Sequence, residues 1–287
     1  MVRYKGRVIM PLPHYIHVYQ RPKQGSNFIQ RYQIYNYQHS IVNQGWFDTA
    51  SGDIAVRSEA EGQRILEQYL GAFVAIYVDN PAEPIWEGLI NRITFNSGSV
   101  SYTASLDELA NRVSVVYTGT TNTAAETAVA NNTASQAIYG IKQEQIEFGV
   151  DTSAGTQRTT LRDTILAQRA YPQTSITQSQ GNSNIVHLEL MGIFHTLEWQ
   201  KIFTAAVTAT STMSVAAAAF IATVSNTTTF FDNSDTSKIS TNAVTAPVQQ
   251  RAVSYWDRLL ALAESGDGSN YWVAGILPTN RVTGKRV

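Results

Sequence analysis

The sequence contains no cysteine and few charged residues. Without cysteine, disulfide bonds and thiolate metal sites are excluded, and the redox compartment is not indicated. Charged residues make up 15% of the 287 positions, against about a quarter in an average protein. The formal net charge of −1 argues against a nucleic-acid-binding protein held by a broad basic surface. Low charge with abundant Ser, Thr, Asn and Gln is typical of a subunit covered by neighbours; an ordinary soluble monomer is the alternative.

Long hydrophobic runs are also missing from the sequence. The N-terminal residues include basic side chains but lack the continuous apolar core of a signal peptide. The most apolar run, 213–224, is too short to span a membrane and contains Ser and Thr. We therefore expect a soluble protein with no membrane insertion.

Motifs for catalysis, cofactors and metals are lacking too. The sequence contains no phosphate-binding loop, dinucleotide fingerprint or nucleophile elbow. His14 and His17 would face opposite sides of a strand, and the polar segments 232–235 and 266–270 do not have the spacing of a calcium loop. Carboxylate pairs arise by chance in a chain with 22 acidic residues. The sequence therefore predicts no enzyme, no cofactor and no metal site.

A clear strand pattern occupies residues 85–117. Segment 86–95 is rich in β-branched and aromatic residues, and the polar turn at 96–99 supplies Asn and Gly for a tight reversal. In segment 100–106 the side-chain character alternates with period two, which is typical of a strand with one buried face. Segment 107–111 is long enough for one helical turn, and segment 112–117 is predicted to be a third strand. This order favours a small β-barrel over a flat sheet.

The second half of the chain repeats this order. A polar turn at 180–183 precedes a predicted strand at 185–191, a corner, and a return strand at 199–203. The sequence therefore predicts a mainly β protein of the α+β class, with two related small β-barrel domains joined by helical connectors. The expected domains are a first barrel over 1–118, a linker and helical crossover over 119–172, and a second barrel with helices over 173–287.

Four helices are expected around these strands. Ser58 is a good N-cap for a helix that stops near Gly71. Apolar periodicity predicts helices over 156–171 and 254–263, and alanine content favours one over 213–224. A strand is expected at 271–277.

The order of several segments resembles that of bacteriophage tail hub, or baseplate hub, proteins. The similar segments read EGLINRITFNSGSVSYTASLDELANRVSVVYT, ASQAIYGIKQE, an arginine-bearing helix ending in Tyr171-Pro172, VHLELMGIFHTLEW and AVSYWDRLLALAESGDGSNYWVAGILPTNRV. The resemblance covers most of the chain from about residue 86 onward and does not include the first eighty or so residues. It implies two related barrels with helical connectors in a homotrimer whose six barrels match a six-fold tail tube.

The resemblance implies a structural virion protein. Such a hub connects the tail tube to the tail tip and provides a central channel. The implied partners are further copies of the chain (a trimer), a tail tube or distal tail protein, the tape-measure protein and a tail spike or tip protein, with DNA only in passage. The implied location is the virion tail, assembled in the host cytoplasm. The alternatives are a distal-tail adaptor ring or a receptor- or carbohydrate-binding tail protein.

Eight residues are candidates for subunit interfaces or for the lining of the channel. A lumen that conducts DNA should be polar or acidic rather than basic, because each phosphate neutralised by Lys or Arg adds binding free energy that opposes passage. We therefore expect loops such as 96–99 and 180–183 to line it, and arginines to face protein interfaces. The candidates are Asn96, Ser97, Ser99, Tyr32, Tyr35, Tyr37, Arg158 and Arg162.

The three tyrosines alternate with Gln and Asn. This pattern predicts an amphipathic strand. The alternative is a contact surface for protein or carbohydrate, because tyrosine supplies rigid contact area with a polar tip.

Overall fold

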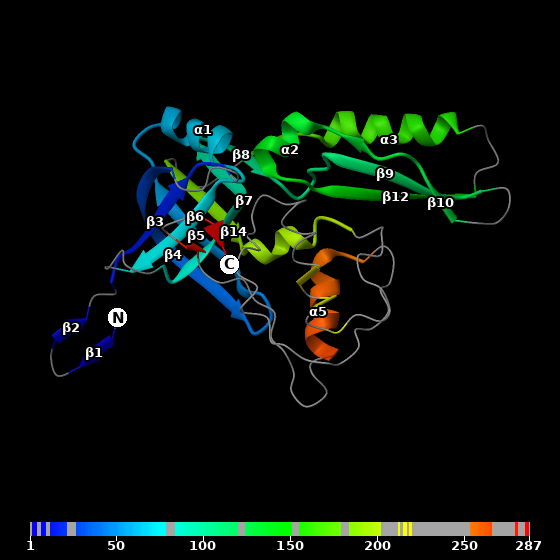
Figure 1. Cartoon of the computed structure of the whole chain (residues 1–287). Helices are drawn as coiled ribbons and strands as arrows, with labels where there is room; N and C mark the ends of the chain where they lie inside the picture. The colour runs from blue at the N-terminus through cyan, green and yellow to red at the C-terminus, as the bar shows by residue number, and fades with distance from the viewer. Residues whose placement is uncertain are drawn as a thin grey trace.

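The computed structural model of the chain describes residues 2–4, 7–9, 12–21, 27–78, 84–119, 124–150, 155–178, 184–201, 212, 215–216, 218–219, 253–265, 279–280 and 285–286. Figure 1 shows a β-barrel, an arm of sheet and helix that projects from it, and the helix α5 (Tyr255–Ser265) below the arm. None of the described helices is both long enough and apolar enough to cross a membrane.

Six antiparallel strands close into the barrel. Around the barrel the order is β6, β3, β4, β5, β14 and β7, and pairing between β6 and β7 completes the circle. Along strands such as β3 and β14, buried residues alternate with less buried ones, so that one face of the sheet fills the interior, whereas β6 is buried over five consecutive residues. Ile16, Ile54, Ile76, Ile93 and Leu188 are among the fully buried residues of this core. The strands are β3 (His14–Tyr19), β4 (Phe28–Val42), β5 (Trp46–Ala55), β6 (Phe73–Val78), β7 (Trp86–Ser97) and β14 (Ile185–Met191).

Helix α1 (Glu59–Gln68) packs over one end of the barrel. Ser58 caps it, because its side chain accepts a hydrogen bond from the backbone N–H of Glu61 at 3.2 Å. Ile65 is buried against the core, and a Cβ atom on Gly62 would lie only 2.4 Å from the ring of Phe95. Glycine at position 62 therefore lets the helix approach β7 closely.

Two further strands extend the sheet beyond the barrel. The second half of β7 pairs with β8 (Val100–Ser105), and β8 pairs with β13 (Thr174–Gln178). All five residues of β13 are exposed. The long strand β7 therefore belongs both to the barrel and to this extension.

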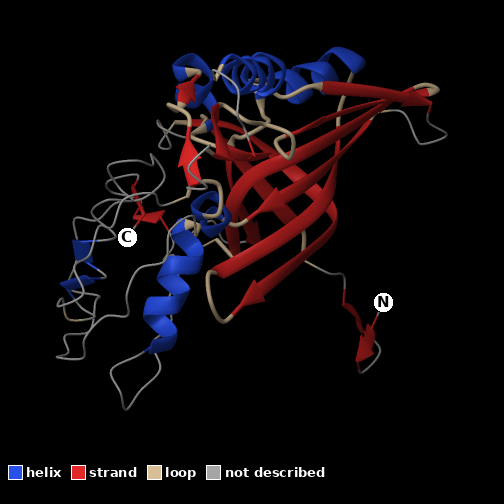
Figure 2. Cartoon of the chain, turned by 90° about the vertical axis from the view of Figure 1, so that its right-hand side faces the viewer, coloured by secondary structure: helices blue, strands red, loops and turns tan. Residues whose placement is uncertain are grey.

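The arm is a second, smaller sheet with a helix on one face. Strand β9 is central, antiparallel to β10 and β11 on one edge and parallel to β12 on the other. Figure 2, turned by 90°, shows helices along the top of the barrel and arm, whereas α5 lies apart from them and below. The elements are β9 (Arg112–Thr118), β10 (Ala124–Glu126), β11 (Ala130–Asn131), α2 (Thr133–Tyr139), β12 (Gln143–Val150) and α3 (Thr156–Arg169).

A buried polar joint connects the arm to the barrel. The fully buried Asn111 donates from Nδ2 to the carbonyl oxygen of Gly140 at 2.7 Å and accepts at Oδ1 from the N–H of Lys142 at 2.9 Å. The Nζ of Lys142 in turn donates to the carbonyl oxygen of Leu106 at 2.6 Å. These bonds tie the loop after β8 to the start of β12, so the direction of the arm is set where it leaves the barrel.

Helix α5 packs beside the 3₁₀ turn η2 (Ile193–Leu197) that follows β14. Its Trp256 lies against Phe194, with ring centroids 4.8 Å apart. Ser254 caps α5 by accepting from the N–H of Asp257 at 3.0 Å. Two short antiparallel pairs complete the described structure, β1 (Val2–Tyr4) with β2 (Arg7–Ile9) and β15 (Thr279–Asn280) with β16 (Lys285–Arg286).

The structure confirms the β-rich α+β class and the main local predictions. Strands occupy 86–97, 100–105, 112–118 and 185–191, and helices begin after Ser58 and occupy 156–169 and 255–265.

The prediction of two related barrels is not met among the described residues. Strand β14, expected in a second barrel, pairs with both β5 and β7 and so completes the first one. Strand β9, expected to continue the barrel, begins the sheet of the arm, because both of its edges are taken by β10, β11 and β12.

Three finer predictions also differ from the structure. Segment 107–111 forms a turn rather than a helical turn, with the N–H of Leu109 donating to the carbonyl oxygen of Leu106. The expected linker and helical crossover over 119–172 contains the strands β10, β11 and β12 as well as the helices α2 and α3. The described part of the return strand predicted at 199–203 forms a single isolated β-bridge, between Lys201 and Ser254. The strand predicted at 271–277 and most of the helix predicted at 213–224 lie outside the described residues.

Candidate functional site

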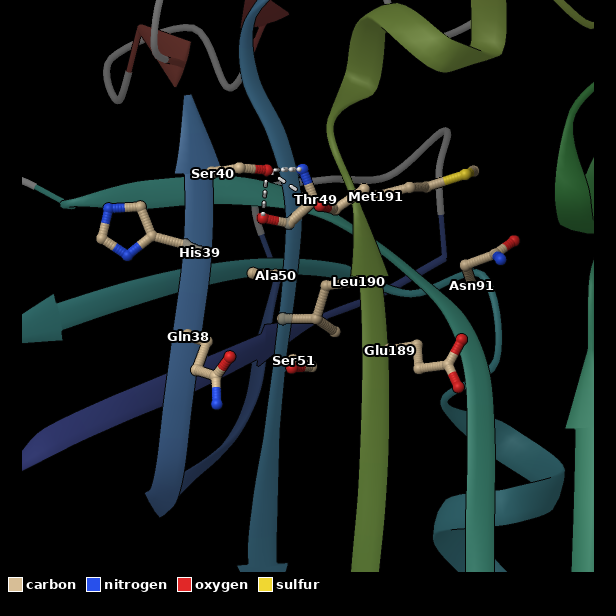
Figure 3. A pocket seen from close by; sticks show the side chains of 10 residues that line it. All are labelled: Gln38, His39, Ser40, Thr49, Ala50, Ser51, Asn91, Glu189, Leu190 and Met191. Atoms are coloured by element: carbon tan, nitrogen blue, oxygen red, sulfur yellow. Dashed lines mark hydrogen bonds between the residues drawn. The ribbon is translucent and has the colours of Figure 1, made fainter. Parts of the chain in front are cut away.

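A polar hollow of about 430 Å³ lies on the barrel wall where β4, β5, β14 and β7 run side by side. Figure 3 shows the buried residues Ala50 and Leu190 in its middle, with polar side chains around them. The lining residues are Gln38, His39, Ser40, Thr49, Ala50, Ser51, Asn91, Glu189, Leu190 and Met191.

A β-bulge between β4 and β5 shapes the upper part of the hollow in Figure 3. Pairing passes from His39–Ala50 to Ile41–Phe47, so Asp48 and Thr49 together oppose the single residue Ser40. The Ser40 hydroxyl holds this geometry, because it donates to Oδ2 of Asp48 at 2.9 Å and accepts from the N–H of Thr49 at 3.2 Å. A bulge interrupts the alternation of a strand and redirects its side chains.

Two more irregularities border the same hollow. Between β14 and β7 the pairing passes from Glu189–Arg92 to Leu190–Ile90, which leaves Asn91 as the extra residue. Between β4 and β5 the segment 36–37 is opposed by one residue, and Asn36 has a positive φ of 51°. Three interruptions around one patch bring consecutive polar residues to one place, which regular alternation would prevent.

The carboxylate at one side of the hollow is compensated by an arginine. Both oxygens of Glu189 accept from Arg92 at 3.3 Å, and Arg92 also pairs with Asp107. Burial alone would raise the pKa of Asp107, but hydrogen bonds from Asn91, Ser105 and Arg92 hold it below its usual value. Both carboxylates are therefore paired with the same guanidinium group.

A histidine compensates the acidic group on the opposite side. His195 approaches Oδ1 of Asp48 with Nε2 at 2.9 Å and Oε2 of Glu198 with Nδ1 at 3.2 Å. Burial lowers the pKa of His195, but its hydrogen bonds to Glu198 and Asp48 and their charges outweigh burial and raise the pKa above its ordinary value. Both nitrogens can donate at once only in the protonated ring, which explains the direction.

A second histidine pair lies on the barrel wall outside the hollow. Nδ1 of His187 lies 2.7 Å from Oδ1 of Asp53, and Asn36 donates to Oδ2 of the same carboxylate at 2.7 Å. Among the described residues, His187 therefore pairs with a carboxylate. No group of three or more His, Asp or Glu residues in the described ranges could hold a metal ion.

Comparisons with protein-family models, curated proteins and solved structures give no match. The function is therefore inferred from the geometry of the chain itself.

The predicted lumen residues lie together in one hairpin. Asn96 and Ser97 end β7, and Ser99 lies in the turn to β8, where Gly98 has a positive φ of 60°. The predicted loop 180–183 lies outside the described residues, but its flanks are close by, because Gln178 pairs with Val100 and Ile185 pairs with Asn96. The two predicted loops therefore start at the same end of β7 and β8.

The predicted tyrosine surface is only partly present. Tyr32 points into the barrel and is buried, Tyr37 is half-buried beside His14, and Tyr35 alone is well exposed, at 47%. The amphipathic strand is thus confirmed as β4, and the three tyrosines do not form one continuous contact surface.

The two candidate arginines contact their own arm. The guanidinium carbon of Arg158 lies 3.6 Å from the ring centroid of Tyr117, and Arg162 donates to the carbonyl oxygen of Ala128 at 2.7 Å. Both lie on α3 of the arm, outside the β7–β8 hairpin that carries Asn96, Ser97 and Ser99.

The residues of the hollow were not predicted from the sequence. The available signal was the segment 28–42, a run long for a single regular strand, with Asn36 and Ser40 at positions that interrupt the alternation. Such residues mark bulges, but a bulge depends on the partner strand, so the signal alone does not give the site.

Proposed function

We propose that this protein is a structural assembly subunit that associates with copies of itself around an axis. The observation that carries the proposal is the open edge of β13. Its sequence, Thr-Ser-Ile-Thr-Gln, contains no charge and no proline, and among the described strands none pairs with its outer edge. Natural proteins usually protect such edges with lysine, proline or a bulge, because an open edge pairs readily with another chain.

The side chains of β13 support the same conclusion. Ile176 is 67% exposed although it pairs with Tyr102, which packs against the barrel core. The face of the sheet that packs against the core therefore extends to β13, where the side chain of Ile176 is exposed. A neighbouring subunit that pairs with this edge would cover Ile176 as well.

The proposed setting is the hub of a bacteriophage tail, between the tail tube and the tail tip, with a central channel. The order of segments from about residue 86 onward supports it, together with the polar β7–β8 turn as part of the channel lining. The proposed partners are a tail tube or distal tail protein, the tape-measure protein and a tail spike or tip protein. An adaptor ring at the distal end of the tail is the alternative within the same class.

The number of copies is proposed as three. The described residues supply one barrel per chain, and a ring of six such barrels would need six copies of the chain rather than three. Native mass spectrometry of the full chain distinguishes these two stoichiometries directly.

The role of β13 is tested by Ile176→Lys, which places a charge on the open edge. We expect the wild-type chain to form a closed oligomer, alone or with tail-tube protein, and the variant to be monomeric. Val150→Lys is the matched control, because Val150 is an exposed apolar residue of the arm, at 71% exposure, and should leave assembly unchanged. A wild-type chain that is monomeric in both conditions, or equal assembly of the two variants, would contradict the proposal.

A further inference from the structure

We propose that the hollow between β4, β5, β14 and β7 binds a neutral saccharide through a single sugar residue. The proposal does not depend on self-association, because all its lining residues come from one chain. A volume of about 430 Å³ is within the range of about 300–1,000 Å³ that is usual for small-molecule sites.

The charge balance selects an uncharged ligand. Glu189 is paired with Arg92 at 3.3 Å, and Asp48 is paired with His195 at 2.9 Å. A cation would compete with partners that are already in place, and an anion would meet the carboxylate of Glu189 at the wall. The site therefore offers no free charge of either sign to a ligand.

The hydrogen-bonding groups suit hydroxyl groups. The amide of Gln38 and the hydroxyl of Ser51 lie opposite each other on β4 and β5, and neither bonds to another described side chain. Each can donate and accept, as a sugar hydroxyl can, so one diol can satisfy both. On the other side of Ser51, its pair partner Glu189 keeps acceptor capacity beside the arginine.

The remaining lining suits the carbon face of a sugar ring. Ala50, Leu190 and Met191 give the hollow an apolar part within a polar border. His39 lies at the border, where its ring stacks on Tyr37 with ring centroids 5.3 Å apart and an interplanar angle of 21°. An apolar patch bordered by amide and hydroxyl groups matches a molecule with one C–H face and an equatorial belt of hydroxyls.

Ligand-observed saturation-transfer NMR and calorimetry on the full chain test the proposal. The probes are glucose, galactose and N-acetylglucosamine, with glucosamine and glucose 6-phosphate as charged counterparts. We expect at least one neutral sugar to bind saturably with a Kd in the millimolar range and to bind more tightly than either charged counterpart. Absence of saturable binding of all three neutral sugars, or tighter binding of a charged one, would overturn the proposal.

Two variants assign the binding to the hollow. Ser51→Trp fills it and should abolish binding, whereas Thr164→Trp, at an exposed position of α3, is the matched control and should leave the Kd unchanged. Gln38→Ala changes an exposed side chain, so this variant should fold even if Ser51→Trp does not. It should weaken sugar binding by about tenfold through the loss of hydrogen bonds. An unchanged Kd for Gln38→Ala would contradict the assignment.

Discussion

Replacement of Asn111 by alanine is expected to loosen the arm from the barrel. The side chain of Asn111 is fully buried and bonds to the carbonyl oxygen of Gly140 at 2.7 Å and to the N–H of Lys142 at 2.9 Å. Alanine removes both bonds, together with the bond from Nδ2 to Oγ of Ser135 at 3.3 Å, and leaves a carbonyl and an N–H without these partners. A buried unsatisfied group costs about 1–3 kcal/mol, so two of them give a loss of about 2–6 kcal/mol in the free energy of unfolding.

Urea unfolding measures the size of this loss, and hydrogen exchange locates it. Because the joint lies at the base of the arm, we expect the amides of β9, β12 and α2 to lose protection while β3, β4 and β5 keep theirs. Asn27→Ala is the matched control, since Asn27 is exposed and makes a single side-chain bond to Gln20 at 3.0 Å. It should change the free energy of unfolding by no more than about 0.5 kcal/mol.

Two results would refute this account of the joint. The first is a loss below about 1 kcal/mol for Asn111→Ala, which would mean that water or a shift of the loop replaces both bonds. The second is an equal loss of protection in the barrel and the arm, which would mean that the two parts unfold as one unit and that the joint has no local role.

Two further predictions concern the region around α5 and η2. Trp256→Ala should lower the free energy of unfolding by about 3–5 kcal/mol because the ring is buried against Phe194. Chemical denaturation measures this loss, with Trp46→Ala as the control because Trp46 is half-exposed. An equally small loss for both variants would contradict the prediction. The raised pKa of His195 means that its stabilising bonds to Asp48 and Glu198 are fully present below the unfolded pKa of about 6.5 and are lost as the pH rises through the folded pKa. Stability should therefore fall across that window in the wild-type chain, and a His195→Gln variant that shows the same fall would contradict the assignment.

The elements that could be predicted from the sequence are those encoded locally. The hairpin of β7 and β8 follows from alternation on both sides of an Asn-Ser-Gly-Ser turn, and Gly98 has the positive φ that this turn requires. Helix α1 follows from the Ser58 cap, and α3 from its apolar stripe and the proline at 172.

The closure of the barrel could not be predicted in this way. Strand β14 has the same alternation whether it belongs to the first barrel or to a second one, and its pairing partners in β5 and β7 precede it by about 90 to 140 residues. The pattern of a strand gives the face that is buried but not the neighbour that pairs with it. The apparent repeat in the second half therefore indicated a strand correctly and its barrel wrongly.

The candidate site was hidden for a related reason. Asn91 is an ordinary residue of β7 until its pairing with β14 leaves it unopposed, and Ser40 becomes important only because Asp48 and Thr49 oppose it together. A bulge is a property of two strands, so neither sequence segment shows it alone.

The low charge content of the chain has an internal explanation as well as the expected external one. Nine polar or charged residues in the described ranges are buried, and seven of them are neutral, among them Asn111, Ser114 and Ser135. A buried amide or hydroxyl needs only hydrogen-bond partners, whereas a buried charge needs a counter-charge as well. Most of the buried polar positions in the described part of the chain therefore hold neutral residues. Composition alone thus overstates how much of the surface is covered by neighbours, and the open edge of β13 is the more specific sign of a partner.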